Sequence, residues 1–237
     1  TILGDADPAI VTQGLRMDSY FSANSLDFPA LGSAEFNGTS DYIEVNPAPV
    51  GAESAITISG WINTTQTFSG FKVILSKGTP IGYEDFIVFG GNTNKLGLYV
   101  TTNLGNTGNI YATTTINDGA WHHFACQWDS VSNEAKIYIN GSLENTTART
   151  GSTLKNTDSR MTIGAYSSIS DYFNGNLANV AIWNRALNSD EINSIMWKSY
   201  SELDAVQKNG LQAWYALDDI TGTTVPDSTG TNNGTAN

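Results

Sequence analysis

Short apolar runs separated by clusters of Asn, Asp, Gly and Pro recur along most of this chain of 237 residues. Many short strands at such spacing are typical of an antiparallel β-sandwich or jelly roll. The pattern predicts strands at residues 34–36, 41–45, 55–62, 71–76, 84–89, 95–101, 109–115, 121–128, 135–139, 160–164 and 176–183, and a short candidate at 9–12.

The stretch from Trp121 to Gly141 is the centre of this pattern, and it predicts two strands joined by a polar turn. The first strand, 121–128, carries large side chains on both faces, which is typical of a central strand covered on both sides. Asp, Ser and Asn at 129–133 can hydrogen-bond their own backbone and so favour a turn. After the second strand, Asn140-Gly141 supplies the pair of positive-φ residues that a tight hairpin needs. We therefore expect two β layers.

One helical pattern interrupts the strands. Asn188 followed by Glu191 forms a capping box, and Ile192, Ile195 and Met196 form one apolar stripe. This predicts one short helix near 189–200, covering one end of the sandwich.

Four segments of the chain share their order and composition with one family of β-sandwiches: 34–45 (AEFNGTSDYIEV), 55–62 (AITISGWI), 121–141 (beginning WHHFA and ending YING) and 173–187 (FNGNLANVAIWNRAL). In this order they resemble the laminin-G-like, concanavalin A-like jelly-roll domains. The resemblance implies an all-β fold, a two-sheet antiparallel jelly-roll sandwich. It implies much less about function, because function depends on the sites that a fold carries.

The same resemblance divides the chain. Residues 1–33 are predicted to be a lead-in segment or linker, and residues 34–200 the laminin-G-like domain. The C-terminal segment, 201–237, is similar to the part that usually opens such a domain. It either folds back to complete this sheet, which we favour, or begins a second, truncated copy.

Composition and charge narrow the function. The chain has 11 Lys and Arg against 23 Asp and Glu, a net charge of −12, and no cluster of basic residues. Nucleic-acid binding and attraction to anionic membranes are therefore disfavoured. No apolar run approaches the ~20 residues that span a bilayer. The single cysteine, Cys126, permits no internal disulfide and is expected to be buried and inert.

Catalytic motifs are missing. Glycoside hydrolases of concanavalin A-like sandwiches place paired carboxylates on one strand, and no Glu-x-Asp-x-Glu occurs here. Glu84 and Asp85 are adjacent, so in a regular strand they point to opposite faces. His122 and His123 are likewise neighbours in a strand. We expect a non-catalytic protein, with a polysaccharide hydrolase or lyase as the least favoured option.

Calcium is implied only by the resemblance. The family often holds one Ca²⁺ near an early turn, a late strand and the segment similar to the C-terminal part of this chain. The matching positions are Asp41, Asn176 and Asp227, although Ala178 and Asn179 stand where the family usually has an acidic pair. The alternative is that the aspartates only cap turns.

Sugar sites on sandwiches combine an aromatic platform with Asp, Asn and backbone donors in loops. Loop tyrosines with such neighbours predict the ligand-binding set Tyr83, Asp85, Tyr166, Asp171, Tyr172 and Asn174.

The sequence therefore predicts a non-catalytic recognition module at an extracellular, cell or virion surface, which binds a glycan or cell-surface polysaccharide with calcium as a candidate cofactor. The alternative is a structural or oligomerisation domain of a phage virion or bacterial surface assembly, in contact with other subunits.

Overall fold

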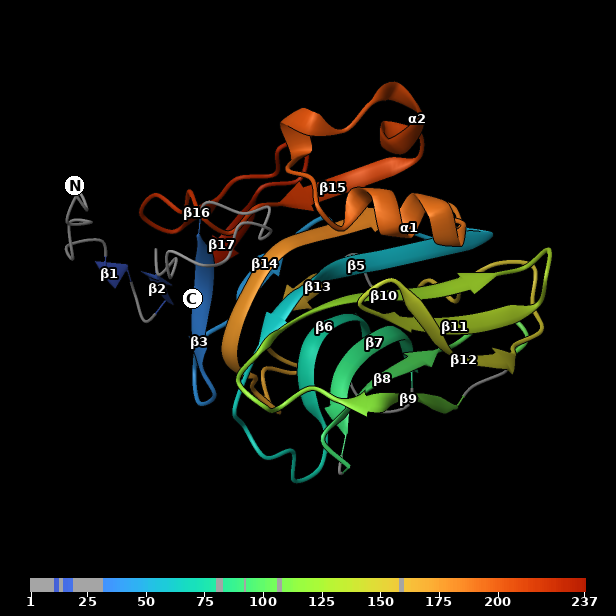
Figure 1. Ribbon diagram of the computed structural model, residues 1–237, viewed down its shortest axis with the longest axis horizontal. Coiled ribbons are helices and arrows are strands. Elements are labelled where there is room, and N and C mark those ends of the chain that lie inside the picture. The colour runs from blue at the N-terminus through green and yellow to red at the C-terminus, as the bar shows by residue number, and fades with distance from the viewer. Residues whose placement is uncertain are drawn as a thin grey trace.

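The computed structural model describes residues 32–78, 84–91, 93–105, 108–157 and 160–237, and the backbone alone of residues 11–12, 15–18, 79 and 83. These residues form a sandwich of two β-sheets, and every strand pair within the sheets is antiparallel (Figure 1). The predicted all-β jelly-roll sandwich is confirmed. Each strand predicted between residues 34 and 183 has a counterpart, and the candidate at 9–12 overlaps β1, with residues 9–10 outside the described part of the chain.

The first sheet has nine strands in the order β1-β2-β3-β14-β5-β10-β11-β12, with β15 paired to β14. Their bounds are β1 Val11–Thr12, β2 Leu15–Asp18, β3 Ser33–Asn37, β5 Ala55–Asn63, β10 Trp121–Asp129, β11 Glu134–Ile139, β12 Ser142–Ala148, β14 Asn174–Trp183 and β15 Leu211–Tyr215.

The second sheet has eight strands in the order β16-β17-β4-β13-β6-β7-β8-β9. Their bounds are β4 Ile43–Val45, β6 Lys72–Thr79, β7 Tyr83–Gly91, β8 Lys95–Val100, β9 Asn109–Thr115, β13 Met161–Ile163, β16 Thr224–Val225 and β17 Gly234–Ala236. The C-terminal segment thus adds strands to both sheets, because β15 pairs with β14 and β17 pairs with β4.

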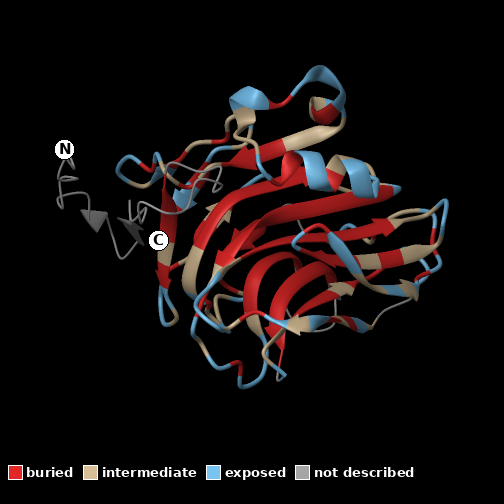
Figure 2. Ribbon diagram, in the orientation of Figure 1, coloured by how far each residue is buried: buried red, intermediate tan, exposed pale blue. Residues whose placement is uncertain are grey.

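The main core lies between the two sheets (Figure 2). Phe124 and Trp128 of β10 enter it from one sheet and Phe86 of β7 from the other, and all three are fully buried. The Trp128 Nε1–H donates to the Arg149 carbonyl at 2.8 Å, so the indole keeps its hydrogen bond inside the core. Strand β10 lies between β5 and β11 with every interior residue buried, which confirms it as a central strand. Cys126 is buried within it, and burial raises the pKa of its thiol.

The predicted helix is present but shorter. Helix α1 covers Ser189–Ile195, and Asn188 and Glu191 form the expected capping box. It packs on the outer face of the nine-stranded sheet against Trp183 rather than at one end of the sandwich (Figure 1). A 3₁₀ turn, η1 Tyr200–Glu202, and a second helix, α2 Ala205–Lys208, follow it. No helix in the described ranges is long and apolar enough to cross a membrane.

Candidate functional site

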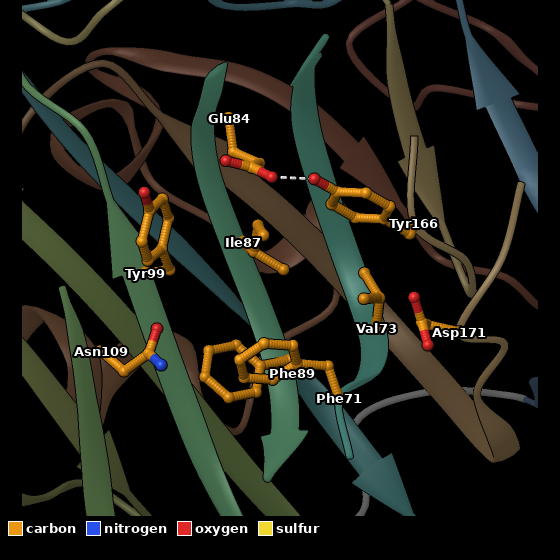
Figure 3. Close-up of a pocket in the computed structure, with 9 residues that line it drawn as sticks. All are labelled: Phe71, Val73, Glu84, Ile87, Phe89, Tyr99, Asn109, Tyr166 and Asp171. Carbon is orange, nitrogen blue, oxygen red and sulfur yellow. Dashed lines mark hydrogen bonds between the residues drawn. The ribbon is translucent and has the colours of Figure 1, made fainter. Parts of the chain in front are cut away.

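A hollow of about 420 Å³ lies on the outer face of the eight-stranded sheet, over β6 to β9. We call it the outer-face hollow. Its volume falls within the range of about 300–1,000 Å³ that is common for small-ligand sites. Aromatic and aliphatic side chains form most of its lining, and a few polar groups interrupt them (Figure 3): Phe71, Val73, Glu84, Ile87, Phe89, Tyr99, Asn109, Tyr166 and Asp171.

The floor of the hollow is an aromatic cluster centred on Phe89. The Phe89 ring lies edge-on to Phe71, with the ring centroids 4.5 Å apart, and edge-on to Tyr111 at 5.7 Å. A Cβ at Gly97, which is opposite Phe89 on β8, would come within 2.4 Å of the Phe89 ring. Glycine at this position therefore lets the ring lie over the β8 backbone. Phe71 remains 45% exposed, so one aromatic surface is open to solvent.

A β-bulge decides which acidic residue reaches the hollow. Lys77 pairs with Phe86, but the next residue, Gly78, pairs with Glu84, so Asp85 is an extra residue on β7. One extra residue shifts the alternation of the strand, and every side chain beyond it changes face. Glu84 therefore lines the outer face with Ile87 and Phe89, and Asp85 points inward.

The inward carboxylate of Asp85 is fully buried in an ion pair. The Lys77 Nζ lies 2.5 Å from the Asp85 Oδ2, and Lys77 is itself 1% exposed. Lys77 also donates to the Asn156 Oδ1 at 2.8 Å, and the Thr157 N–H and hydroxyl donate to the Asp85 Oδ1. Burial raises the pKa of Asp85, while Lys77 and Thr157 act in the opposite direction.

The loop between β13 and β14 forms one wall of the hollow. Its turn is closed by the bond from the Tyr166 N–H to the Ser170 carbonyl, and the Val73 N–H joins it to β6 through the Asp171 carbonyl; both bonds are 2.8 Å long. Asp171 has a φ of 52°, a left-handed conformation that Asp tolerates. The Tyr166 hydroxyl donates to the Glu84 carboxylate (Figure 3). Strand and loop therefore hold one another across the hollow.

Two of the predicted ligand-binding residues, Tyr166 and Asp171, line the hollow. Asp85 lies on the other side of β7, because the bulge reverses the alternation that the sequence predicts. The side chain of Tyr83, at the start of β7, lies outside the described residues.

Tyr172 and Asn174 lie beyond the wall rather than in the hollow. Tyr172 forms a parallel bridge with Val73, which joins the loop to β6. The Asn174 N–H donates to the Gln66 Oε1, and its carbonyl accepts from the Thr64 hydroxyl.

The sequence did not predict the other lining residues. Ile87, Phe89 and Tyr99 occupy the outer-face positions of β7 and β8. In a strand with large side chains on both faces, the sequence alone does not tell which alternate residues face the core. The one signal in the sequence is that β7 has apolar side chains on both faces, so the face outside the core must be covered by other residues or by a ligand.

Of the predicted calcium ligands, Asp227 is occupied by protein donors. Its carboxylate accepts from the N–H groups of Trp214, Thr229 and Asn232 and from the Thr229 hydroxyl, at 2.6 to 3.0 Å. A carboxylate has about four lone-pair sites, so these donors use them. Burial by itself raises the pKa of Asp227, but the bonds from Thr229, Trp214 and Asn232 outweigh it and hold the pKa below its ordinary value.

Asp41 and Asn176 have other partners. The Asp41 carboxylate accepts from the Asn37 N–H and amide and from the Ser40 hydroxyl, so it closes its own turn. The Asn176 amide donates to the Ser33 hydroxyl at 3.3 Å. Within the described part of the chain, no three His, Cys, Asp or Glu side chains are grouped to hold a metal ion. Each of the three predicted ligands thus has protein partners in this arrangement, and calcium binding at these positions stays a prediction.

The two adjacent histidines do not reach the hollow. His123 is buried in β10 against Trp61, with the ring centroids 5.4 Å apart, and burial lowers the pKa of His123 to about 3. His122 contacts Asp118 through its Nε2 at 3.0 Å.

A family model described as the concanavalin A-like lectin/glucanases superfamily matches residues 37–193. The chain belongs to this superfamily. Its jelly roll is therefore an example of the superfamily fold. No curated protein matches the sequence.

Solved structures of similar fold include proteins of several kinds. A candidate carbohydrate-binding protein from Bacteroides ovatus matches with a TM-score of 0.71 and 22% identity, over 90% of this chain and 59% of that one. The chain thus spans 59% of the length of that relative. The heptameric SAP-like pentraxin of Limulus polyphemus matches with a TM-score of 0.55 and 19% identity, over 72% of this chain and 88% of that one. The CBM40 of the Ruminococcus gnavus IT-sialidase matches with a TM-score of 0.55 and 16% identity, over 71% of this chain and all of that one.

Proposed function

We propose that the chain is a non-catalytic glycan-binding module and that the outer-face hollow is its binding site. The observation that carries the proposal is the combination of an open aromatic surface with polar groups around one hollow. Phe71 and Tyr166 offer ring faces to the apolar side of a sugar, and Glu84, Asn109 and Asp171 offer hydrogen-bonding groups. Small-ligand sites typically have this composition, a mostly apolar lining with a few placed polar groups.

The relatives support the proposal at the level of their descriptions. One is described as a candidate carbohydrate-binding protein, and another is the CBM40 of a sialidase. Binding rather than catalysis also suits the acidic residues, because Glu84 and Asp85 lie on opposite faces of β7, and the Tyr166 hydroxyl donates to the Glu84 carboxylate. We infer from the same fold and composition that the module works at a cell or virion surface.

The first experiment is a glycan array, probed once in millimolar Ca²⁺ and once in chelator. We expect binding in both conditions, because Asp227 and Asp41 already have protein partners. Binding that disappears in chelator would show that binding depends on calcium, and would favour a calcium site at these two aspartates. Silence in both conditions would contradict the glycan proposal and favour the alternative, a structural domain of a larger assembly, which light scattering would then test.

The site itself is tested by Phe71→Ala on the best glycan of the array. Removing a half-exposed ring that stacks on a ligand is expected to weaken binding about tenfold, from the apolar area it covers. Trp197→Ala is the matched control, because Trp197 is 50% exposed and packs on Trp61, away from the hollow. Equal effects of the two variants would place the site elsewhere. Release of reducing ends or unsaturated products from any bound polysaccharide would contradict the non-catalytic assignment.

A further inference from the structure

The outer-face hollow has an unbalanced set of charges. Glu84 and Asp171 bring two carboxylates to its lining, and none of the described residues that line it is a lysine, arginine or histidine. Arg149 interacts with Tyr99 but is not part of the lining. Figure 3 shows Tyr166 between Glu84 and Asp171, with Tyr99 and Asn109 on the other side. The acidic groups are therefore on the loop side of the hollow, around one aromatic ring.

Such a site discriminates between ligands by charge. A uronate, sialate or sulfated sugar would bring its negative charge next to two carboxylates, in a chain that already carries a net charge of −12. Juxtaposed like charges disfavour the wrong ligand strongly. An ammonium group gains from the same carboxylates, and the faces of Tyr166 and Phe71 add a cation–π attraction.

The position of Glu84 strengthens the effect. Its side chain is only 9% exposed, so water screens its charge much less than it screens a surface carboxylate. The β7 bulge and the Tyr166 hydroxyl fix its orientation before any ligand arrives. A carboxylate that is held in place does not have to be ordered when the ligand binds, which favours affinity.

We propose that the outer-face hollow recognises glycans that carry free amino groups, with the ammonium beside Tyr166, on the side of the hollow that holds the Glu84 and Asp171 carboxylates, and the sugar ring against the aromatic side chains. This inference rests on the proposed glycan-binding function and adds the chemical class of the glycan.

The test compares three oligosaccharides of one length, of which the first two differ only in N-acetylation and the third is anionic. A β-1,4-linked glucosamine oligomer, its N-acetylated counterpart and a galacturonate oligomer are titrated calorimetrically into the protein near pH 6, where the free amine is protonated. We expect the glucosamine oligomer to bind about tenfold or more tightly than the acetylated one, the size expected for a charge-assisted contact. The galacturonate oligomer should bind most weakly.

Two substitutions connect this preference to the hollow. Glu84→Gln keeps an acceptor for the Tyr166 hydroxyl, and Asp171→Asn keeps a residue that tolerates a left-handed backbone. Each is expected to weaken the binding of the glucosamine oligomer about tenfold and to leave the acetylated oligomer within about twofold. Asp190→Asn, an exposed change of the same charge on α1, is the matched control and should change neither.

The outcomes separate this proposal from the one on which it rests. Equal affinity for the glucosamine and acetylated oligomers would overturn amine recognition and leave glycan binding intact. A preference that survives both substitutions would overturn its assignment to the outer-face hollow. Binding of ethanolamine or choline as tight as that of the glucosamine oligomer would overturn the amino-sugar assignment, because the sugar ring would then contribute nothing. No binding of any saccharide, here or on the array, would overturn both proposals.

Discussion

The buried ion pair behind the hollow gives the sharpest prediction about stability. Lys77→Met removes the only charged group that hydrogen-bonds the Asp85 carboxylate among its described partners and replaces it with a side chain of similar length. Among the described residues, the donors that Asp85 then keeps are those of Thr157. We expect a large loss of stability from this one change and a smaller loss when the charge of Asp85 is removed as well.

The magnitudes follow from the geometry. With Nζ and Oδ2 separated by 2.5 Å, the attraction between the two charges is about 7 kcal/mol at an effective dielectric constant of about 20. Burial of the two ions costs several kcal/mol for each of them, so the net contribution of the pair is small. Removing Lys77 alone leaves the cost for Asp85 uncompensated, which typically destabilises by about 3–5 kcal/mol. Because Thr157 still donates to Asp85, we expect about 3 kcal/mol.

The assay is a double-mutant cycle in urea, followed by tryptophan fluorescence at neutral pH. Lys77→Met, Asp85→Asn and the double variant are compared with the wild type, and a common m-value is required. The double variant should be only about 1–2 kcal/mol less stable than the wild type, because it contains no buried charge. The reasoning would be refuted if the double variant lost as much stability as the two single variants together. A loss below about 1 kcal/mol for Lys77→Met would refute it as well.

Three further changes test other parts of the fold. Gly97→Ala places a Cβ 2.4 Å from the Phe89 ring and should destabilise by about 1–3 kcal/mol in thermal unfolding, while an unchanged melting temperature would contradict the packing. Asp227→Asn should lower stability by about 1–2 kcal/mol at neutral pH. The folded-state pKa of Asp227 lies below the ordinary value of about 3.9, so this difference in stability should persist above that pH and vanish as the pH falls through the folded-state pKa. Urea unfolding across acidic pH measures it, and a difference that stays constant would contradict the prediction. Asn188→Ala removes the bond to the Glu191 N–H and should cost about 1 kcal/mol, with Asn188→Asp as a control that keeps the cap.

The architecture was largely predictable because it depends on patterns that repeat. Strand β10 carries large side chains on both faces, and it is a central strand of its sheet. Strand β12, Ser142–Ala148, was not predicted, because it is an edge strand whose residues are all exposed or half-buried. A strand in that position needs no apolar residues, since its backbone pairs on one side only and neither face enters the core.

The site was less predictable because it depends on one irregularity. Period-2 alternation assigns Asp85 to the face of Ile87 and Phe89, and the β7 bulge, which lies opposite Gly78, reverses that assignment. A bulge has little signature in the sequence beyond a glycine, and Gly78 is opposite Glu84 with a φ of 124°. The wall formed by the loop between β13 and β14 was easier to predict, because Tyr166 and Asp171 are loop residues and their exposure does not depend on strand alternation.

The same bulge connects the buried side of β7 with the hollow. Glu84 and Asp85 are consecutive, and the single extra residue on β7 determines that Asp85 faces the core and Glu84 faces the hollow. If the ion pair with Lys77 stabilises the bulge, Lys77→Met should weaken glycan binding although Lys77 does not line the hollow. The loss of affinity should then come from a displaced Glu84 side chain and not from unfolding of the protein. Binding measured well below the melting temperature of the variant separates the two causes, with Gly97→Ala as a comparison that disturbs the aromatic floor instead. Wild-type affinity in folded Lys77→Met would show that the backbone of β6 and β7, and not the ion pair, determines the direction in which Glu84 points.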